Sequence, residues 1–246
     1  MKKLFYIIFV SLFLTACQKT IDCISSAGEK VNYEYPLNDF DTLVVNNDFE
    51  IHFIQDTVNE MIIFAYKKYA DAVSYEIRNN CLVLDNSYSC KFTKPKKNNV
   101  RIDLHVKNLS LARINYPAKL ISENTLLNDN EIGVIVNTKF CEANLDVNCR
   151  VFYFWNTHLN GGKMYLKGNS EFLKLWNASL FSVDASKLET NYAFTDNNSK
   201  ADIYINVNKE LNCTIRSSGN VYYTGNPSKI IVNDSLSSGK LIKLND

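Results

Sequence analysis

Cys17 is the residue whose surroundings point to a definite chemical reaction. Two lysines open the chain, an apolar run extends from Leu4 to Leu14, and the small residues Thr15 and Ala16 precede the cysteine. A positive start, a short hydrophobic segment and a small-residue processing site are the parts of an export signal. The pattern predicts that residues 1–16 are removed as a signal peptide and that the Cys17 thiol is acylated.

Leu14-Thr15-Ala16-Cys17 resembles a bacterial lipobox, in which the chain is cut just before a lipidated cysteine. The alternative is an uncleaved transmembrane helix, but the apolar run has about eleven residues and a span needs roughly 20. Several acyl chains, palmitate among them, would anchor the mature protein stably in a membrane. Gln18 replaces the Asp of the enterobacterial sorting rule. We therefore expect the outer membrane, on its periplasmic side or at the cell surface.

No catalytic motif follows Cys17. The sequence has no Gly-x-Ser-x-Gly nucleophile elbow, no His-Glu-x-x-His and no glycine-rich phosphate loop. The three histidines (His52, His105 and His158) lie far apart in the sequence, so we expect no metal site and no cofactor. We predict that the protein is not an enzyme. The alternative, a polysaccharide-active enzyme, requires a pair of carboxylates on one face.

Six cysteines remain after Cys17, and their redox state is open. An even number in an exported chain is consistent with disulfides, and Cys81 and Cys90 could close a hairpin loop. Buried free thiols fit the sequence equally well, because a thiol packs as a small hydrophobic group. The six are Cys23, Cys81, Cys90, Cys141, Cys149 and Cys213.

The charge balance excludes one class of partner. The chain has 27 basic and 26 acidic residues. A protein without a basic excess has no electrostatic means of holding a polyanion, so we expect no nucleic-acid partner.

The chain after the signal peptide divides into a tether and one domain. Residues 17–35 are predicted to be a lipidated N-terminus and irregular tether, and residues 36–246 a single domain. Its first part, 36–99, contains predicted strands at 43–45, 49–54 and 61–65, then a helical turn at 69–73. A hairpin around Asn79-Asn80 and a basic loop at Lys91–Asn99 follow. We expect this part to pack at one end of the repeat coils formed by 100–246.

A period near 20 residues runs through the second part. Trp155-Asn156 and Trp176-Asn177 are 21 residues apart. Three ladders extend the period: Phe152, Leu173, Ala193, Cys213; Phe154, Leu175, Thr195, Ile215; Met164, Val183, Ile203. Such a period predicts an all-β parallel β-solenoid with coils of about 20 residues, in which the buried Thr195 hydroxyl needs a backbone partner. The alternative is a twisted β-sandwich.

The chain resembles a known family at both ends of the domain. Ser218-Gly219-Asn220-Val221-Tyr222-Tyr223-Thr224-Gly225-Asn226-Pro227, followed by Ser238-Gly239-Lys240-Leu241-Ile242, is similar to the closing signature of the putative auto-transporter adhesin, head GIN domain family. Phe40–Val45 and Phe49–Ile54 resemble its opening. The resemblance covers roughly 36–244 and implies an exported or lipid-anchored protein of Bacteroidetes-like bacteria with a β-solenoid-like fold. It implies no catalytic residues. This chain has fewer glycines and more cysteines than the family pattern.

The outward side chains of the coils form the candidate binding surface. If the Phe152 and Phe154 ladders point inward, strand alternation turns their neighbours outward. We expect Trp155 and Trp176 to stack on adjacent coils, with Asp196 and Arg216 continuing the row. The predicted platform for a sugar ring or a partner protein consists of Tyr153, Trp155, Lys174 and Trp176. The alternative is that a loop or the N-terminal strands cover the tryptophans as part of the core.

These features predict a membrane-anchored, adhesin-like lipoprotein of the cell envelope. Its partners would be the membrane, through acyl chains on Cys17, and a glycan, matrix component or surface protein. The alternative function is an envelope scaffold without a dedicated ligand.

Overall fold

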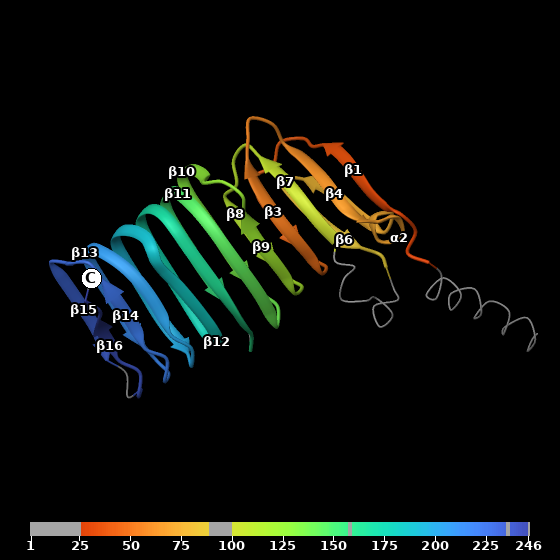
Figure 1. Cartoon of the computed structure of the whole chain (residues 1–246). Coiled ribbons are helices and arrows are strands. Elements are labelled where there is room, and N and C mark those ends of the chain that lie inside the picture. Colours follow the sequence, from red (N-terminus) through yellow and green to blue (C-terminus); the bar gives the residue numbers. More distant parts are fainter. Residues whose placement is uncertain (1–25, 89–99, 157–158, 235–236, 246) are drawn as a thin grey trace, which may run out of the picture.

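The computed structural model describes residues 26–88, 100–156, 159–234 and 237–245 (Figure 1). The predicted β-solenoid is confirmed: the described chain forms about six turns of roughly 21 residues. All strands belong to one 16-stranded sheet, whose backbone pairing runs from coil to coil. The elements are β1 (Lys30–Pro36), β2 (Thr42–Val45), β3 (Phe49–Gln55), β4 (Glu60–Tyr66), α2 (Lys67–Ala70), β5 (Val73–Arg78), β6 (Cys81–Asn86), β7 (Val100–Val106), β8 (Leu111–Ile114), β9 (Ala118–Ser122), β10 (Leu126–Val136), β11 (Phe140–Asn156), β12 (Gly161–Ser199), β13 (Ile203–Ile215), β14 (Val221–Thr224), β15 (Lys229–Asp234) and β16 (Leu241–Lys243).

Two broad faces enclose the core. The first face contains β4, β7, β3, β9 and the first part of β11, and the second contains β6, β2, β8 and the later parts of β10 and β11. The long strands β11, β12 and β13 turn the corners and contribute to both faces (Figure 1). Along β11 every second side chain enters the core from Phe140 to Cys149 and again from Phe152 to Asn156, and the alternation changes phase at Arg150 and Val151.

The inward ladders follow the predicted period with one correction. Phe152 pairs with Leu173, and Phe154 with Leu175, 21 residues on, and all four are fully buried. Val183 pairs with Ile203, also as predicted. The last step is different, because Ala193 pairs with Leu211 and Thr195 with Cys213. The register between β12 and β13 shifts between Ala185 and Glu189, where the Ser186 N–H donates to Asp184. At this point the β12 coil contains extra residues that the β13 coil lacks.

Thr195 corrects a second expectation. Its side chain is fully buried, yet its hydroxyl has no nitrogen or oxygen partner in the described structure. The neighbouring group is the Cys213 thiol, with which Thr195 is in register. The Thr195 hydroxyl therefore lies beside the Cys213 thiol inside the apolar ladder, in place of the expected backbone partner.

The cysteines of the described chain are free thiols. Cys141, Cys149 and Cys213 are buried in the core, and Cys81 is partly buried. Cys141 lies on an inward ladder in β11, where a thiol fills the space of a small apolar side chain. Cys23 and Cys90 lie outside the described residues.

The N-terminal part differs from its predicted arrangement. Residues 17–35 were expected to be irregular, but β1 is a strand that pairs antiparallel with β4, because Val31, Tyr33 and Tyr35 alternate and pack against the core. The helical turn occurs at Lys67–Ala70, earlier than predicted. The hairpin around Asn79-Asn80 is confirmed, since both residues have a positive φ and Arg78 pairs with Cys81.

The N-terminal strands and hairpin pack at one end of the stack, as expected, but strands of the later part of the chain lie among them. β3 pairs in parallel with β7 on one side and β9 on the other (Figure 1). In the same way, β2 pairs in parallel with β6 and with β8. The coil order in space therefore differs from the sequence order. β1, β4 and β5 close this end with antiparallel pairs.

One buried corner is built from asparagines. Asn156, Asn177 and Asn197 lie above one another, and each Nδ2 contacts the Oδ1 of the next, at 3.5 and 3.3 Å. Asn197 Nδ2 then donates to the Gly219 carbonyl at 3.1 Å. These amides also bond to the turn backbone, for example Asn177 Nδ2 to the Phe181 carbonyl at 2.8 Å. The corner amides thus supply hydrogen bonds where the strand direction changes.

The predicted signal peptide (residues 1–16), Cys17, the predicted loop at Lys91–Asn99 and His158 lie outside the described residues. Within the described ranges, no helix is long and apolar enough to cross a membrane.

Candidate functional site

Three successive coils place aromatic side chains on the outer side of the second face. β11 contributes Tyr153 and Trp155, and β12 contributes the rest as it passes this face twice. Trp155 and Trp176 are in register on adjacent coils, as the alternation predicted. We call the six side chains the aromatic platform: Tyr153, Trp155, Phe172, Trp176, Tyr192 and Phe194.

Neither tryptophan of the platform is covered by the described chain. Trp155 is 48% exposed and Trp176 is 37% exposed, so the N-terminal strands do not bury them. An open hollow of about 460 Å³ lies over this region. Its lining consists of Glu131, Val151, Tyr153, Trp155, Lys174 and Trp176.

Ring contacts join four of the six side chains of the platform. Phe172 and Tyr192 are stacked, with centroids 4.9 Å apart and an interplanar angle of 16°. Trp176 contacts Phe194 at 5.5 Å in a tilted geometry. Cations border the stacked pair, since Arg150 lies 6.0 Å from the Phe172 ring and Lys209 lies 5.6 Å from the Tyr192 ring. Such contacts favour a defined geometry for these four rings.

The charged groups of the platform differ in their partners. Asp196 is engaged, because Arg216 donates from Nε at 2.7 Å and from Nη2 at 3.0 Å. Arg216 was expected to continue the tryptophan row, but it follows the end of β13, and Thr214 is the in-register neighbour of Asp196. Lys174 occupies the middle of the platform, exposed and without a hydrogen bond or ion pair among the described residues.

The Tyr153 hydroxyl is available as a proton donor. Burial raises the pKa of Tyr153, the nearby Glu131 carboxylate raises it further, and Arg113 opposes the shift. The hydroxyl therefore stays protonated at neutral pH and can donate a hydrogen bond at the edge of the hollow.

Half of the platform was missed by sequence reasoning. Phe172, Tyr192 and Phe194 are outward residues of the same two coils as Trp176 and Asp196. The signal was present, because Leu173 and Ala193 were placed on an inward ladder and their neighbours must point the other way. The prediction followed only the tryptophan pair and did not apply the alternation to the whole coil.

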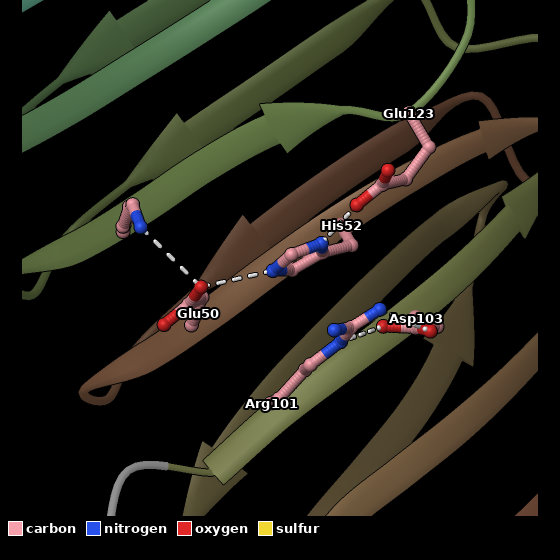
Figure 2. Close-up of polar contacts among 6 residues, drawn as sticks. Glu50, His52, Arg101, Asp103 and Glu123 are labelled. Carbon is pink, nitrogen blue, oxygen red and sulfur yellow. Dashed lines mark hydrogen bonds and ion pairs between the residues drawn. The ribbon is translucent and has the colours of Figure 1, made fainter.

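The first face holds a polar cluster around His52, which is buried on β3 (Figure 2). His52 Nε2 lies 2.9 Å from Glu50 Oε1, and Nδ1 contacts Glu123 Oε1. His52 thus bridges the two carboxylates through its two ring nitrogens. Lys119 Nζ also reaches Glu50, at 3.4 Å.

The cluster continues onto β7 with an ion pair. Arg101 Nε donates to Asp103 Oδ1 at 2.6 Å, and Nη2 donates to Oδ2 at 2.8 Å. Burial acts to raise the pKa of Glu50, but hydrogen bonds from His52 and Lys119 outweigh it and hold that pKa below its ordinary value. The three carboxylates of this cluster, Glu50, Glu123 and Asp103, thus contact His52, Lys119 or Arg101.

Neither face presents an arrangement of ligands for a metal ion. The described residues contain no group of three or more His, Cys, Asp or Glu side chains that could hold one. On the first face, His52 brings two carboxylates, Glu50 and Glu123, close together. Both contact His52 and lie on the face opposite the platform.

This fold and surface define a β-solenoid protein with a rigid, repetitive outer face. The chain belongs to the putative auto-transporter adhesin, head GIN domain family, whose model matches residues 39–227. The resemblance found in the sequence is confirmed. The closing signature has a structural reason: a Cβ on Gly219 or Gly239 would overlap the carbonyls of the preceding coils, so the Ser-Gly corner requires glycine.

Solved structures show the same fold in distant relatives. A putative adhesin from Bacteroides fragilis is 16% identical with a TM-score of 0.77, and the match covers 88% of this chain and 97% of that one. A putative adhesin from Parabacteroides distasonis is 13% identical with a TM-score of 0.60, and the match covers 88% of this chain and 98% of that one. A protein of the same species described as a putative lipid binding protein is 16% identical with a TM-score of 0.58. This match covers 89% of this chain and 98% of that one. No curated protein matches the chain.

Proposed function

We propose that the protein is a non-enzymatic binding protein of the cell envelope that engages a glycan, a matrix component or a surface protein through the aromatic platform. The observation that carries this proposal is the set of six aromatic side chains, exposed or partly exposed on three successive coils. Aromatic rings with a polar border are typical of recognition surfaces, because they bury a large area at a small cost in side-chain entropy.

The anchor is the second part of the proposal. Lys2 and Lys3, the apolar run and Leu14-Thr15-Ala16-Cys17 support cleavage before Cys17 and acylation of its thiol. Residues 17–29 would then join the lipid to β1, and the outer membrane is the proposed location. Metabolic labelling with an alkyne-bearing palmitate should tag the wild type but not Cys17→Ser. The variant should also leave the membrane fraction, and a variant that stays labelled would contradict the anchor.

The platform is tested by removing its most exposed rings. Trp155→Ala with Trp176→Ala should abolish attachment to immobilised glycans, matrix proteins or whole cells while the melting temperature stays close to that of the wild type. The matched control is Tyr204→Ala with Tyr222→Ala. This pair stacks at 4.8 Å with an angle of 9° on β13 and β14, on the first face. The control variant should still attach.

Two results would overturn the proposal. Unchanged attachment of the tryptophan variant would show that the platform is not the binding surface. A large fall in its melting temperature would show that the tryptophans belong to the core. If the wild type attaches to nothing in these screens, the envelope scaffold without a dedicated ligand becomes the better account.

A further inference from the structure

Lys174 is the central charge of the platform. Its side chain projects from β12 between Phe172 and Trp176, with Tyr153 in register on the preceding coil. It has no ion pair or hydrogen bond among the described residues, whereas Asp196 at the edge is held by Arg216. A cation placed among aromatic faces offers a charge-assisted contact to an acidic ligand that stacks on the same rings.

We infer that the platform binds an acidic oligosaccharide, with a carboxylate of the sugar paired to Lys174 and the sugar rings stacked on Trp155 and Trp176. This inference rests on the proposed function and names its ligand class. Lys174 and the two tryptophans line the same open hollow, so one ligand reaches all three.

Glu131 supports a sugar over an acidic peptide. Its carboxylate lines the other side of the hollow, is exposed, and has no ion pair among the described residues. A carboxylate can only accept hydrogen bonds, so the ligand must present donors there. An acidic sugar provides a carboxylate for Lys174 and hydroxyl donors for Glu131, and the hydroxyl end of Tyr153, which lies over Gly133, adds a further donor on the Glu131 side. A second carboxylate close to Glu131 would be repelled.

The dimensions of the platform set the length of the ligand. Neighbouring coils are about 4.8 Å apart, and outward residues along a strand are about 6.6 Å apart. The three coils and three outward positions of the platform therefore span roughly 10 by 13 Å. Each aromatic ring is similar in size to one pyranose, so we expect two or three sugar rings to fill the surface.

The test compares saccharides that differ in the carboxylate. Isothermal titration calorimetry would use tetrasaccharides of hyaluronan, alginate and polygalacturonate as acidic probes, and chitotetraose and cellotetraose as neutral ones. At least one acidic probe should bind the wild type about tenfold more tightly than the neutral probes, the effect expected of one charge-assisted contact. Lys174→Gln should lose this preference while its affinity for neutral probes is unchanged. Lengthening the preferred probe to a hexasaccharide should add nothing.

The controls separate this inference from the proposed function. Lys187→Gln changes a lysine that lines a different hollow, with Asp184 and Tyr165, and should behave as the wild type. Equal binding of acidic and neutral probes, or a preference that survives in Lys174→Gln, would overturn the inference and leave the platform as the binding surface. If no saccharide binds but attachment to cells still requires Trp155 and Trp176, the ligand is a protein and the inference is wrong. If attachment is also independent of the tryptophans, the proposed function fails as well.

Discussion

The ring of Tyr153 lies directly over Gly133, its in-register neighbour on β10, in the space that a Cβ at position 133 would occupy. Any other residue at this position would push the ring away from the sheet. Tyr153 therefore lies flat along the solenoid at the edge of the hollow, with its ring supported by bare backbone. A glycine outside the platform thus sets the orientation of a residue within it.

Gly133→Ala should weaken ligand binding without unfolding the protein. The added methyl group would overlap the end of a movable side chain, so Tyr153 can rotate out while the backbone pairing stays intact. We expect the free energy of unfolding to change by less than about 1 kcal/mol, and the affinity for the platform ligand to fall. Urea unfolding and calorimetry on the same variant check both statements. Gly161→Ala is the control, because its Cβ would meet only Leu180 at 3.9 Å. Equal loss of binding in both variants would contradict the role of Tyr153.

The asparagine corner should be a major source of stability. Asn177 is buried, donates to the Phe181 carbonyl and contacts Asn197. Asn177→Ala would leave the Phe181 carbonyl without this donor, so we expect a loss of about 1–3 kcal/mol in the free energy of unfolding. A lower urea midpoint at an unchanged m-value is the measurement.

The neighbouring Asn198 provides the comparison for this corner. It is exposed on the same strand, and Asn198→Ala should shift the midpoint little. If both alanine variants have the same stability, the buried ladder contributes no more than a solvated asparagine.

Glu50 should make stability depend on acid pH. Its pKa is lowered in the folded state, so its contribution is present above its ordinary value of 4.5 and is lost as the pH falls through the folded value. The urea midpoint of the wild type should therefore fall on acidification below about pH 5, and Glu50→Gln should make this fall less steep. Glu142→Gln serves as a control. Glu142 on β11 is exposed and is the in-register neighbour of Lys119 on the side opposite Glu50. A Glu50→Gln curve parallel to that of the wild type would contradict the prediction.

The core thiols should resist alkylation until the protein unfolds. Burial raises the pKa of Cys141 to about 12 and that of Cys149 to about 11, so neither forms the reactive thiolate near pH 8. Mass-spectrometric mapping after iodoacetamide treatment should find both unmodified in the native protein and both modified in urea. The unfolded thiols ionise near their ordinary value of 9.0 while the folded ones do not, so stability should decline as the pH rises past that value. Rapid native labelling of Cys141 would be incompatible with its place in the ladder.

The sequence predicted the coil far better than the order of the coils. Strand alternation and the 21-residue step are local properties, so Phe152, Leu173, Phe154 and Leu175 could be assigned to the core without a structure. The position of β3 between β7 and β9 could not be predicted from the sequence. A strand in a parallel sheet offers pairing groups on both edges, so a later strand of the chain can pair with either edge. The strand β1 was missed although Val31, Tyr33 and Tyr35 alternate with polar residues, because it is only half-buried at the edge and is defined by its pairing with β4.

The amino-acid sequence by itself determined the repeat, the inward ladders, the family and the outward direction of Trp155 and Trp176. These follow from periodicities that every coil repeats. Tertiary structure alone decided which outward residues meet. It placed Tyr153 over Gly133, stacked Phe172 on Tyr192 and left Lys174 unpaired among them. The physical reason is register: a bulge or a shift of two residues between coils, such as the one that pairs Thr195 with Cys213, changes every lateral neighbour while leaving the inward and outward pattern intact.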